Sequence, residues 1–294
     1  MTLDQIRIFL AVAEDCHVTR AAGRLNLTQS TVSAALRTLE DRYGVQLFDR
    51  SGRGITLTAE GKLFQAEAAR LLAAARHATQ LLEDLSGAVR GSISVICSQT
   101  VANGWLPPRL VSFHEQAPQI DIALRVGNTA QCVEAIASGA ADLAFIEADV
   151  TAPFLTQAHV ATDHLALVVG NRHPWAMQPP AGLSAIYDSR WVLREQGSGT
   201  RSTFEDHLRA HGLTAPLPVF LELPSNESVC AAVAGSTLAT VISRDVAGPH
   251  LATGRMVEIP LPLPARAFNM IRHTDRSVSR AAGLLIAHIQ GEQG

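Results

Sequence analysis

The first 45 residues alternate apolar and polar positions with the spacing of three short helices. A capping box at residues 2–5 begins the first helix, whose apolar side chains recur at helical spacing until about Asp15. The pattern predicts a second helix over residues 18–25, with Thr19 as its N-cap. A third helix is expected over residues 28–43, with Thr28 as N-cap and Gly44 after its last turn.

The third helix has two unlike faces at about 100° per residue. Its apolar face carries Val32, Leu36, Leu39 and Tyr43, whereas its opposite face is small, polar and free of acidic residues before Glu40. Such a face can enter a DNA major groove, where Gln and Ser side chains hydrogen-bond base edges. The alternative is an ordinary solvated helix face.

A two-stranded wing is predicted after this helix. Residues 45–48 and 54–58 are typical of short strands, and the turn between them contains glycine and two arginines, Arg50 and Arg53. A wing beside a recognition helix would bring both arginines near the DNA backbone or a minor groove. Asp49 either dilutes this charge or orients Arg50 by pairing with it.

The order of these residues resembles the LysR-type transcriptional regulators. The similarity covers residues 1–61 without a gap, and its motifs are Ala21-Ala22-x-x-Leu25-x-Leu27-x-Gln29-Ser30-x-Val32-Ser33, Leu39-Glu40-x-x-x-Gly44-Val45-x-Leu47-Phe48-x-Arg50 and Leu57-Thr58-x-x-Gly61. The resemblance implies a winged helix-turn-helix whose residues matching Gln29, Ser30, Ser33 and Arg53 contact DNA. Ala34 departs from the polar residue or arginine of many members, so a contact there would be apolar, for instance with a thymine methyl. The DNA-binding candidates are Thr28, Gln29, Ser30, Thr31, Ser33, Ala34, Arg37, Arg50 and Arg53.

Residues 59–88 contain no proline and repeat apolar positions at helical spacing. A helix of about 28 residues would be about 42 Å long, too long to bury its stripe in one small domain. Pairing with a second copy is expected, and packing against its own chain is the alternative. The resemblance implies an antiparallel pair of such helices in a homodimer or a dimer of dimers, which would bind an inverted-repeat promoter site and contact RNA polymerase.

After Gly91, strand-like and helix-like segments alternate, which favours an α/β domain with largely parallel strands. Strands are predicted at 93–97, 120–126, 143–147, 165–169, 191–194, 219–223, 238–243 and 268–271, with helices at 101–116, 130–138, 200–211 and 227–235. The resemblance continues less specifically here, at Leu106-Pro107, Gly139 to Asp142-Leu143-Ala144, and His173-Pro174. It implies a two-lobed domain similar to periplasmic binding proteins.

The predicted organisation is therefore a winged helix-turn-helix domain (1–58), a linker and dimerisation helix (59–90) and an effector-binding domain (91–294). In the last domain, lobe I comprises residues 91–162 and 267–294, and lobe II comprises residues 163–266. The expected fold class combines all-α and α/β parts.

Composition and charge limit the classes of function that fit the chain. The chain has 294 residues, 47% hydrophobic and 17% charged, which indicates folded domains. Its net charge is −3, with +1 in residues 1–90, so nucleic-acid binding must depend on a local surface. The four cysteines are far apart, and neither a signal peptide nor a long apolar run is present. A cytoplasmic protein without membrane contact is expected.

Polar residues at the predicted strand-to-helix turns form a candidate effector site. Such turns gather at the carboxyl ends of strands, where helix N-termini favour anions. These residues are Ser98, Gln99, Thr100, Asn128, Thr129, Ser198, Thr200 and Asn226. They predict a small anionic effector, and simple helix capping is the alternative. The run Arg194-Glu195-x-Gly197-Ser198-Gly199-Thr200-Arg201 resembles a subgroup that regulates carbon fixation and sulfur assimilation, which implies a phosphorylated, carboxylated or sulfur oxyanion. Gln196 replaces the proline frequent in that subgroup.

No catalytic, metal or cofactor site is expected. Gly197-Ser198-Gly199 is not the G-x-S-x-G of a nucleophile elbow, and the histidines lack metal-ligand spacing. The rival functions are a solute-binding protein and an enzyme on the same two-lobed fold. Cys97 adjoins the predicted effector site, where it is either a redox sensor or an inert buried thiol.

Overall fold

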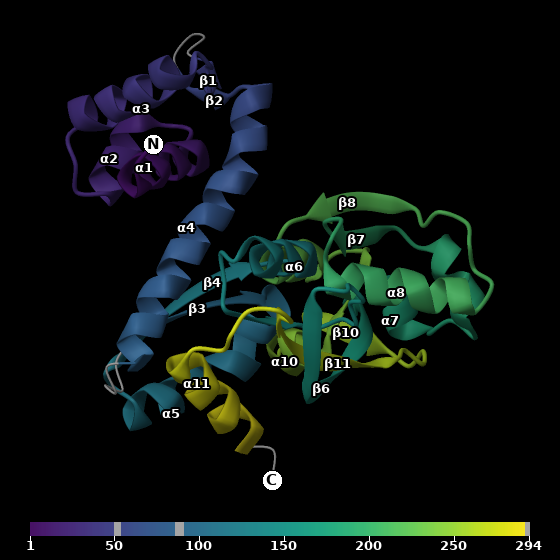
Figure 1. Ribbon diagram of the computed structural model, residues 1–294. Helices are drawn as coiled ribbons and strands as arrows, with labels where there is room; N and C mark the ends of the chain where they lie inside the picture. The colour runs from purple at the N-terminus through teal and green to yellow at the C-terminus, as the bar shows by residue number, and fades with distance from the viewer. Residues whose placement is uncertain (50–53, 86–90, 292–294) are drawn as a thin grey trace. The chain divides into compact units, whose positions relative to one another are not determined.

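The computed structural model describes residues 1–49, 54–85 and 91–291 (Figure 1). The chain forms two compact units, one of Met1–Ala88 with Ser138–Ala140 and the other of Val89–Ala137 with Ala141–Gly294. Each unit has its own hydrophobic core. They are therefore described one at a time.

Three helices form the core of the first unit: α1 (Leu3–Asp15), α2 (Val18–Arg24) and α3 (Gln29–Tyr43). The predicted capping box of α1 is present, and Thr28 and Gly44 bound α3 as expected. The N-cap of α2 is His17, whose side chain accepts from the Arg20 N–H, so the prediction of Thr19 was wrong. The short side chains of Ala21 and Ala22 are buried in the core between these helices.

The wing strands β1 (Phe48–Asp49) and β2 (Thr56–Leu57) pair antiparallel and are shorter than predicted. Glu40 explains part of the difference, because its Oε1 accepts from the N–H groups of Leu47 and Phe48 and so occupies donors that a longer ladder would use. The turn with Arg50 and Arg53 lies outside the described residues.

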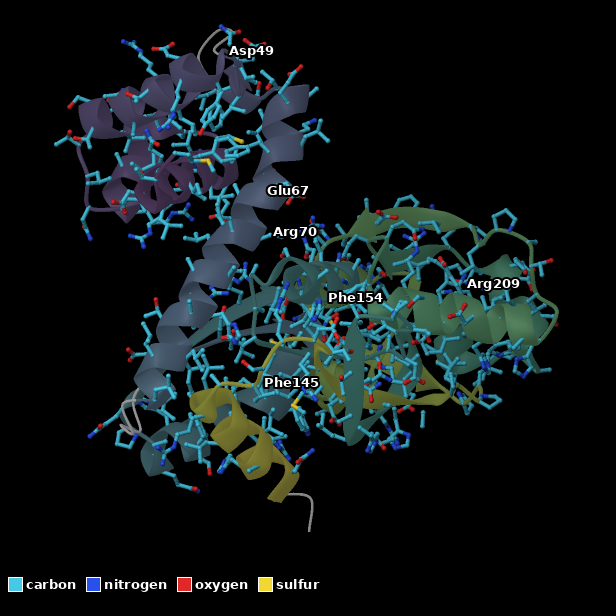
Figure 2. The ribbon with its side chains drawn as sticks, in the orientation of Figure 1. Asp49, Glu67, Arg70, Phe145, Phe154 and Arg209 are labelled. Atoms are coloured by element: carbon cyan, nitrogen blue, oxygen red, sulfur yellow. The ribbon has the colours of Figure 1, made fainter. Side chains whose placement is uncertain are left out.

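Helix α4 (Ala59–Leu85) follows as a single helix of 27 residues, in agreement with the predicted linker helix. Its first turn packs tightly on the wing, since a Cβ on Gly61 would lie 2.1 Å from the carbonyl oxygen of Leu47. Glu67 and Arg70 form an ion pair on its polar side, with 2.6 Å between Oε1 and Nη1 (Figure 2). Among the described residues, no helix is long and apolar enough to cross a membrane.

The second unit is an α/β domain built on a mixed sheet. Its elements are β3 (Gly91–Ser98), the π-helix η1 (Val101–Trp105), α5 (Leu106–Gln116), β4 (Ile120–Gly127), α6 (Thr129–Ser138), β5 (Leu143–Ile146), β6 (Leu155–Gly170), α7 (Pro174–Met177), the 3₁₀ helix η2 (Leu183–Asp188), β7 (Trp191–Arg194), α8 (Gly199–Ala210), β8 (Val219–Leu223), α9 (Asn226–Val233), β9 (Ala239–Ser243), α10 (Arg244–Ala252), β10 (Met256–Ile259), β11 (Ala265–His273) and α11 (Arg280–Gly291).

Two long strands join the lobes of this unit. Paired strands follow the order β4-β3-β5-β11-β6-β9-β7-β8, with β10 beside β6. Residues 155–164 of β6 pair with β11, and residues 165–170 pair with β9 and β10. Lobe I is accordingly β3, β4, β5, β11 and the first part of β6, and lobe II is the second part of β6 with β7 to β10.

The sheet corrects the expectation of largely parallel strands. The outer pairs β3–β4, β3–β5, β7–β8 and β7–β9 are parallel, but every pair made by β6 or β11 is antiparallel within the described residues. The reason is that these two strands carry the chain from one lobe to the other in opposite directions. Residues 155–164 and all of β10 are strands that the sequence pattern does not predict.

Candidate functional site

One face of α3 is exposed and nearly free of acid. Val32 and Leu36 on the opposite face are fully buried, while the predicted DNA-binding face, which we call the α3 ridge, lies outside the core. Its exposed members are Thr28, Gln29, Ser30, Thr31, Ala34 and Arg37, and Ser33 is half-buried. Tyr43, expected inside, is exposed because it stands at the last position of the helix, beyond the packed core.

Local hydrogen bonds order the N-terminal end of this ridge. The Thr28 Oγ1 accepts from the Thr31 N–H at 3.2 Å and lies 2.8 Å from the hydroxyls of Ser30 and Thr31. The Thr19 hydroxyl donates to Gln29 Oε1, so the Gln29 amide nitrogen is the group left to meet an acceptor. The first turn thus presents hydroxyl and amide donors.

Arg37 is the cationic side chain of the ridge. Arg24 pairs with Glu14 and Asp15, while Arg37 has no ion-pair partner among the described residues. Glu40 is directed toward the wing, where its Oε1 accepts from the N–H groups of Leu47 and Phe48. From Thr28 to Arg37 the ridge itself carries no acidic side chain, and the next acid on that face is Asp41, one turn further along the helix.

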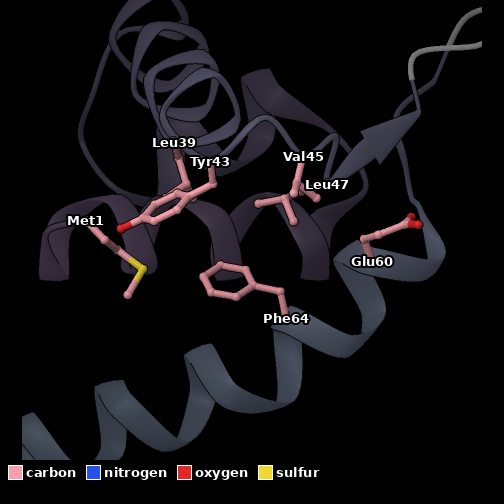
Figure 3. A pocket seen from close by; sticks show the side chains of 7 residues that line it. All are labelled: Met1, Leu39, Tyr43, Val45, Leu47, Glu60 and Phe64. Atoms are coloured by element: carbon pink, nitrogen blue, oxygen red, sulfur yellow. The ribbon is translucent and has the colours of Figure 1, made fainter.

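A second feature of this unit is an apolar hollow of about 310 Å³ on the other side of α3 (Figure 3). The side chains of Leu39, Tyr43, Val45 and Leu47 meet Phe64 of α4 there, with Met1 and Glu60 at its margins. Tyr43 and Val45 are exposed at this hollow. The hollow continues onto α4 through Phe64.

In the second unit, the predicted effector residues of the two lobes meet. Gln99 of lobe I donates through Nε2 to the carbonyl of Pro224, and its Oε1 accepts from the Asn226 N–H, each at 2.9 Å. Thr100 lies 3.4 Å from Asn226 Nδ2, and Asn128 Nδ2 donates to Glu195 at 3.2 Å. Four turns far apart in the chain therefore form one cluster between the lobes.

Arg194 holds the lobe II side of this cluster. Its buried guanidinium donates to Asn226 Oδ1 at 2.6 Å and to both carboxylate oxygens of Glu195. Burial alone would raise the pKa of the Glu195 carboxyl, but the hydrogen bond and charge of Arg194, with the Asn128 amide, hold that pKa below its ordinary value. Arg194 and Glu195 thus form a fixed, ionised pair behind the predicted ligand site.

Helix capping accounts for some of the predicted residues and not for others. Asn128 Oδ1 accepts from the Gln131 N–H in the first turn of α6, and Ser98 Oγ accepts from the Val101 N–H. In contrast, Ser198 makes no side-chain capping bond to α8, and Thr100 makes none to η1. Ser98 and Asn128 consequently have local structural roles, whereas the Thr100 hydroxyl bonds to Glu147 and Asn226, and the Ser198 hydroxyl has no partner among the described residues.

Three buried polar atoms in the cluster have no hydrogen-bond partner among the described residues. They are Thr129 Oγ1, Ser198 Oγ and Glu147 Oε2. Glu147 was not predicted as a site residue, although it directly follows β5 and so stands at a strand end like the others. Native proteins seldom leave buried polar groups unpaired, so this concentration makes the cluster the candidate ligand site of the unit.

Behind the cluster lies an ion pair that sequence analysis also missed. Arg266 donates through Nε to Asp163 Oδ2 at 2.7 Å, and Ser243 donates to the other oxygen of that carboxylate. Arg266 Nη1 donates to Thr200 at 3.0 Å, so Thr200 already has a partner. These residues are buried at the point where β6 and β11 pass between the lobes.

The cysteine chemistry and metal chemistry of the unit are limited. Burial, together with the charge of Glu147, raises the pKa of the Cys97 thiol to about 12, so the reactive thiolate is scarce at neutral pH. Of the two predicted roles for Cys97, this favours the inert buried thiol. No group of three or more metal-binding side chains occurs among the residues that the structure describes.

Comparison with known proteins gives a consistent result for both units. Residues 3–62 match a family model described as bacterial regulatory helix-turn-helix protein, lysR family, and residues 86–294 match one described as LysR substrate binding domain. A relative in Escherichia coli (strain K12), the uncharacterized HTH-type transcriptional regulator YeiE, is 32% identical over 96% of this chain and 94% of its own length.

Two solved structures share the fold. Full-length CbnR complexed with its target DNA covers 99% of both chains with a TM-score of 0.68 and 19% identity. The regulatory domain of CcmR from Synechocystis PCC6803, in complex with 2-PG, covers 69% of this chain and 97% of its own, with a TM-score of 0.63 and 21% identity.

Proposed function

Since the chain belongs to the LysR family of DNA-binding transcriptional regulators, we propose that the α3 ridge reads promoter DNA and that the cluster between the lobes binds a small anionic effector. Regulators of this family act by binding DNA and are not enzymes, so the alternative hypothesis of an enzyme is rejected. The proposed site of action is the cytoplasm, where promoter DNA and RNA polymerase are met.

The observation that carries the DNA-binding proposal is the acid-free ridge of α3. The side chains that form it, between Thr28 and Arg37, are exposed or half-buried, and the neighbouring Glu40 carboxylate is hydrogen-bonded by N–H groups of the wing. Gln29, Ser30 and Ser33 would meet base edges, Thr28, Thr31 and Arg37 would meet phosphates, and Ala34 would make apolar contact. Arg50 and Arg53 of the wing turn are proposed on sequence grounds to bind the backbone or minor groove.

Arg37→Ala tests this assignment in a mobility-shift titration on the promoter region upstream of the gene. Losing one phosphate contact should weaken binding and reduce the slope of log affinity against log salt by about 1. The control is Arg209→Ala, which removes an exposed arginine from α8 of the other unit (Figure 2). Equal affinity and salt slope in the Arg37 variant and wild type would refute the assignment.

A homodimer formed through α4 is also proposed. Several leucines of α4 are exposed in a single chain, namely Leu63, Leu71, Leu81, Leu82 and Leu85. The apolar hollow beside Phe64 extends this stripe. A second copy of α4 is the occupant that matches its length and apolar character, and the two-fold axis would pair two α3 ridges with an inverted repeat.

The effector proposal is supported by the unpartnered polar atoms between the lobes. Hydroxyl donors and the N-terminus of α8 favour a ligand with anionic oxygens. The regulatory domain of CcmR, which has this fold, is known in complex with 2-PG. Because Gln99, Thr100 and Asn128 bond across to lobe II, a ligand in the cluster would change how the lobes hold each other.

A further inference from the structure

The unpartnered oxygen of Glu147 constrains what kind of anion the cluster accepts. We propose that the effector combines an anionic oxygen group with a hydrogen-bond donor, and that it gives this donor to Glu147 Oε2. This inference rests on the proposed effector site and specifies the chemical class of its ligand.

The carboxylate of Glu147 is half satisfied. The residue is 2% exposed, and the Thr100 hydroxyl donates to its Oε1 at 3.2 Å. Its Oε2 has no hydrogen-bond partner among the described residues. Burying a carboxylate oxygen without a hydrogen-bond donor is unfavourable, and a bound ligand would supply that donor.

The unpartnered hydroxyls of Thr129 and Ser198 lie in the same part of the cluster as Glu147. Gly199 brings them together, because a Cβ at that position would lie 2.7 Å from Thr129 Oγ1 and 3.0 Å from Glu147 Cγ. Ser198, whose hydroxyl is free, directly precedes Gly199 as the N-cap residue of α8. Glu147, Thr129 and Ser198 are therefore neighbours around one backbone position.

The hydroxyl groups and the Glu147 carboxylate favour different groups on a ligand. The hydroxyls of Thr129 and Ser198 and the positive end of the α8 dipole attract anionic oxygens. The Glu147 carboxylate only accepts hydrogen bonds and repels such oxygens. An anion without a donor satisfies the first set and opposes the second, whereas one with an O–H or N–H group satisfies both.

Two sources of the donor share this chemistry. It can be an acid or alcohol O–H, as in hydrogen phosphate or a hydroxycarboxylate, or an ammonium group, as in an amino acid. A simple cation would satisfy Glu147 but would bring positive charge to the N-terminus of α8. The anionic group and the donor are thus both required.

Matched small anions test the inference by calorimetric titration of the full-length protein. Glycolate, glycine and acetate differ only in carrying a hydroxyl, an ammonium or a hydrogen, and hydrogen phosphate and sulfate differ in whether an O–H remains. Wild type should bind at least one donor-bearing anion about tenfold or more tightly than its donor-free counterpart, because a site built to hydrogen-bond a donor rejects an analogue without it. Glycolate against glycine then identifies which donor is used.

Glu147→Gln should abolish or reverse this preference, because the amide nitrogen then faces the ligand as a donor itself. Glu115→Gln, which removes an exposed carboxylate on α5, should keep the preference. The inference would be overturned if each donor-bearing anion bound no more tightly than its donor-free counterpart, if no donor-bearing anion bound, or if Glu147→Gln kept the preference. Promoter binding by the same proteins is measured separately by mobility shift. If the wild-type protein does not bind promoter DNA, the proposed function is refuted and not the inference about Glu147.

Discussion

The guanidinium of Arg266 donates to the hydroxyl of Thr200 at 3.0 Å, which joins the first turn of α8 to the strand that connects the two lobes. The same guanidinium is paired with Asp163 on the other connecting strand. A change at the start of α8 would therefore alter contacts with both of the strands that connect the lobes.

Replacing Arg266 by alanine should destabilise the second unit strongly. It leaves the buried Asp163 carboxylate with Ser243 as its remaining side-chain donor, and removing one partner of a buried ion pair costs about 3–5 kcal/mol of unfolding free energy. Denaturant unfolding measures the change. Arg244→Ala, which breaks the exposed pair with Glu258, should cost at most about 1 kcal/mol. Similar losses in the two variants would contradict the role given to Arg266.

Replacing Ser33 by arginine should abolish specific promoter binding without unfolding the protein. Ser33 is half-buried in the middle of the α3 ridge, so a long side chain there would hold the helix away from base edges. Affinity should fall to that for random DNA, about a thousandfold. Mobility shifts and a thermal melt measure both quantities, with Ser202→Arg on the exposed side of α8 as control. The same loss is predicted for Arg53→Ala, and unchanged affinity in both variants would defeat the DNA-binding assignment.

A glutamate in place of Leu82 should weaken the dimer. Leu82 is 69% exposed on α4, and a carboxylate buried between two copies would cost about 2 kcal/mol or more of association free energy. Light scattering over a dilution series gives the dissociation constant. Leu284→Glu changes an exposed leucine of α11 and should leave that constant unchanged. A mass that stays dimeric at every dilution in the Leu82 variant would exclude α4 as the interface.

His173 should make the stability of the protein fall in mild acid. Its ring is buried, Nδ1 accepts from the Trp175 N–H, and Nε2 is hydrogen-bonded with the Ser189 hydroxyl. Burial lowers its pKa, so the unfolded chain gains a proton at a higher pH than the native one. The stabilisation is therefore full above the unfolded pKa of about 6.5 and is lost as pH falls through the native pKa.

Unfolding free energies measured between pH 7 and 5 test this expectation. His173→Gln should show a shallower decline than wild type, while His114→Gln, at an exposed position, should follow wild type. A residual slope is expected because burial also lowers the pKa of His207 and His273. An unaltered slope in His173→Gln would show that this ring does not contribute.

Without effector, Glu147→Gln should stabilise the protein by about 1 kcal/mol, because a neutral amide costs less to bury than a carboxylate with an unpartnered oxygen. Thermal melts in an anion-free buffer measure the difference. Glu115→Gln should have no effect. A Glu147 variant less stable than wild type would indicate that the carboxylate is satisfied in the free protein.

The amino-acid sequence alone determined the local structure and the class of the protein. Capping residues and a helical repeat specify α1, α3 and α4, because these signals act between residues three or four positions apart. Glycine and arginine in the wing and the motifs from Ala21 to Gly61 were sufficient to identify the family. The ridge of α3 followed from the same periodicity, and the turns that supply Thr100, Asn128 and Ser198 followed from where strands end.

Only the tertiary structure decided which of these turns come together and which of their polar atoms have no hydrogen-bond partner. Arg266 contacts residues 66 and 103 positions away, because strand order brings β6 and β11 together with the start of α8, and no local pattern encodes that order. The antiparallel pairing of those strands was missed for the same reason. Glu147 looked like the end of a buried strand, and its unpaired oxygen became visible only when the atoms around it were in place.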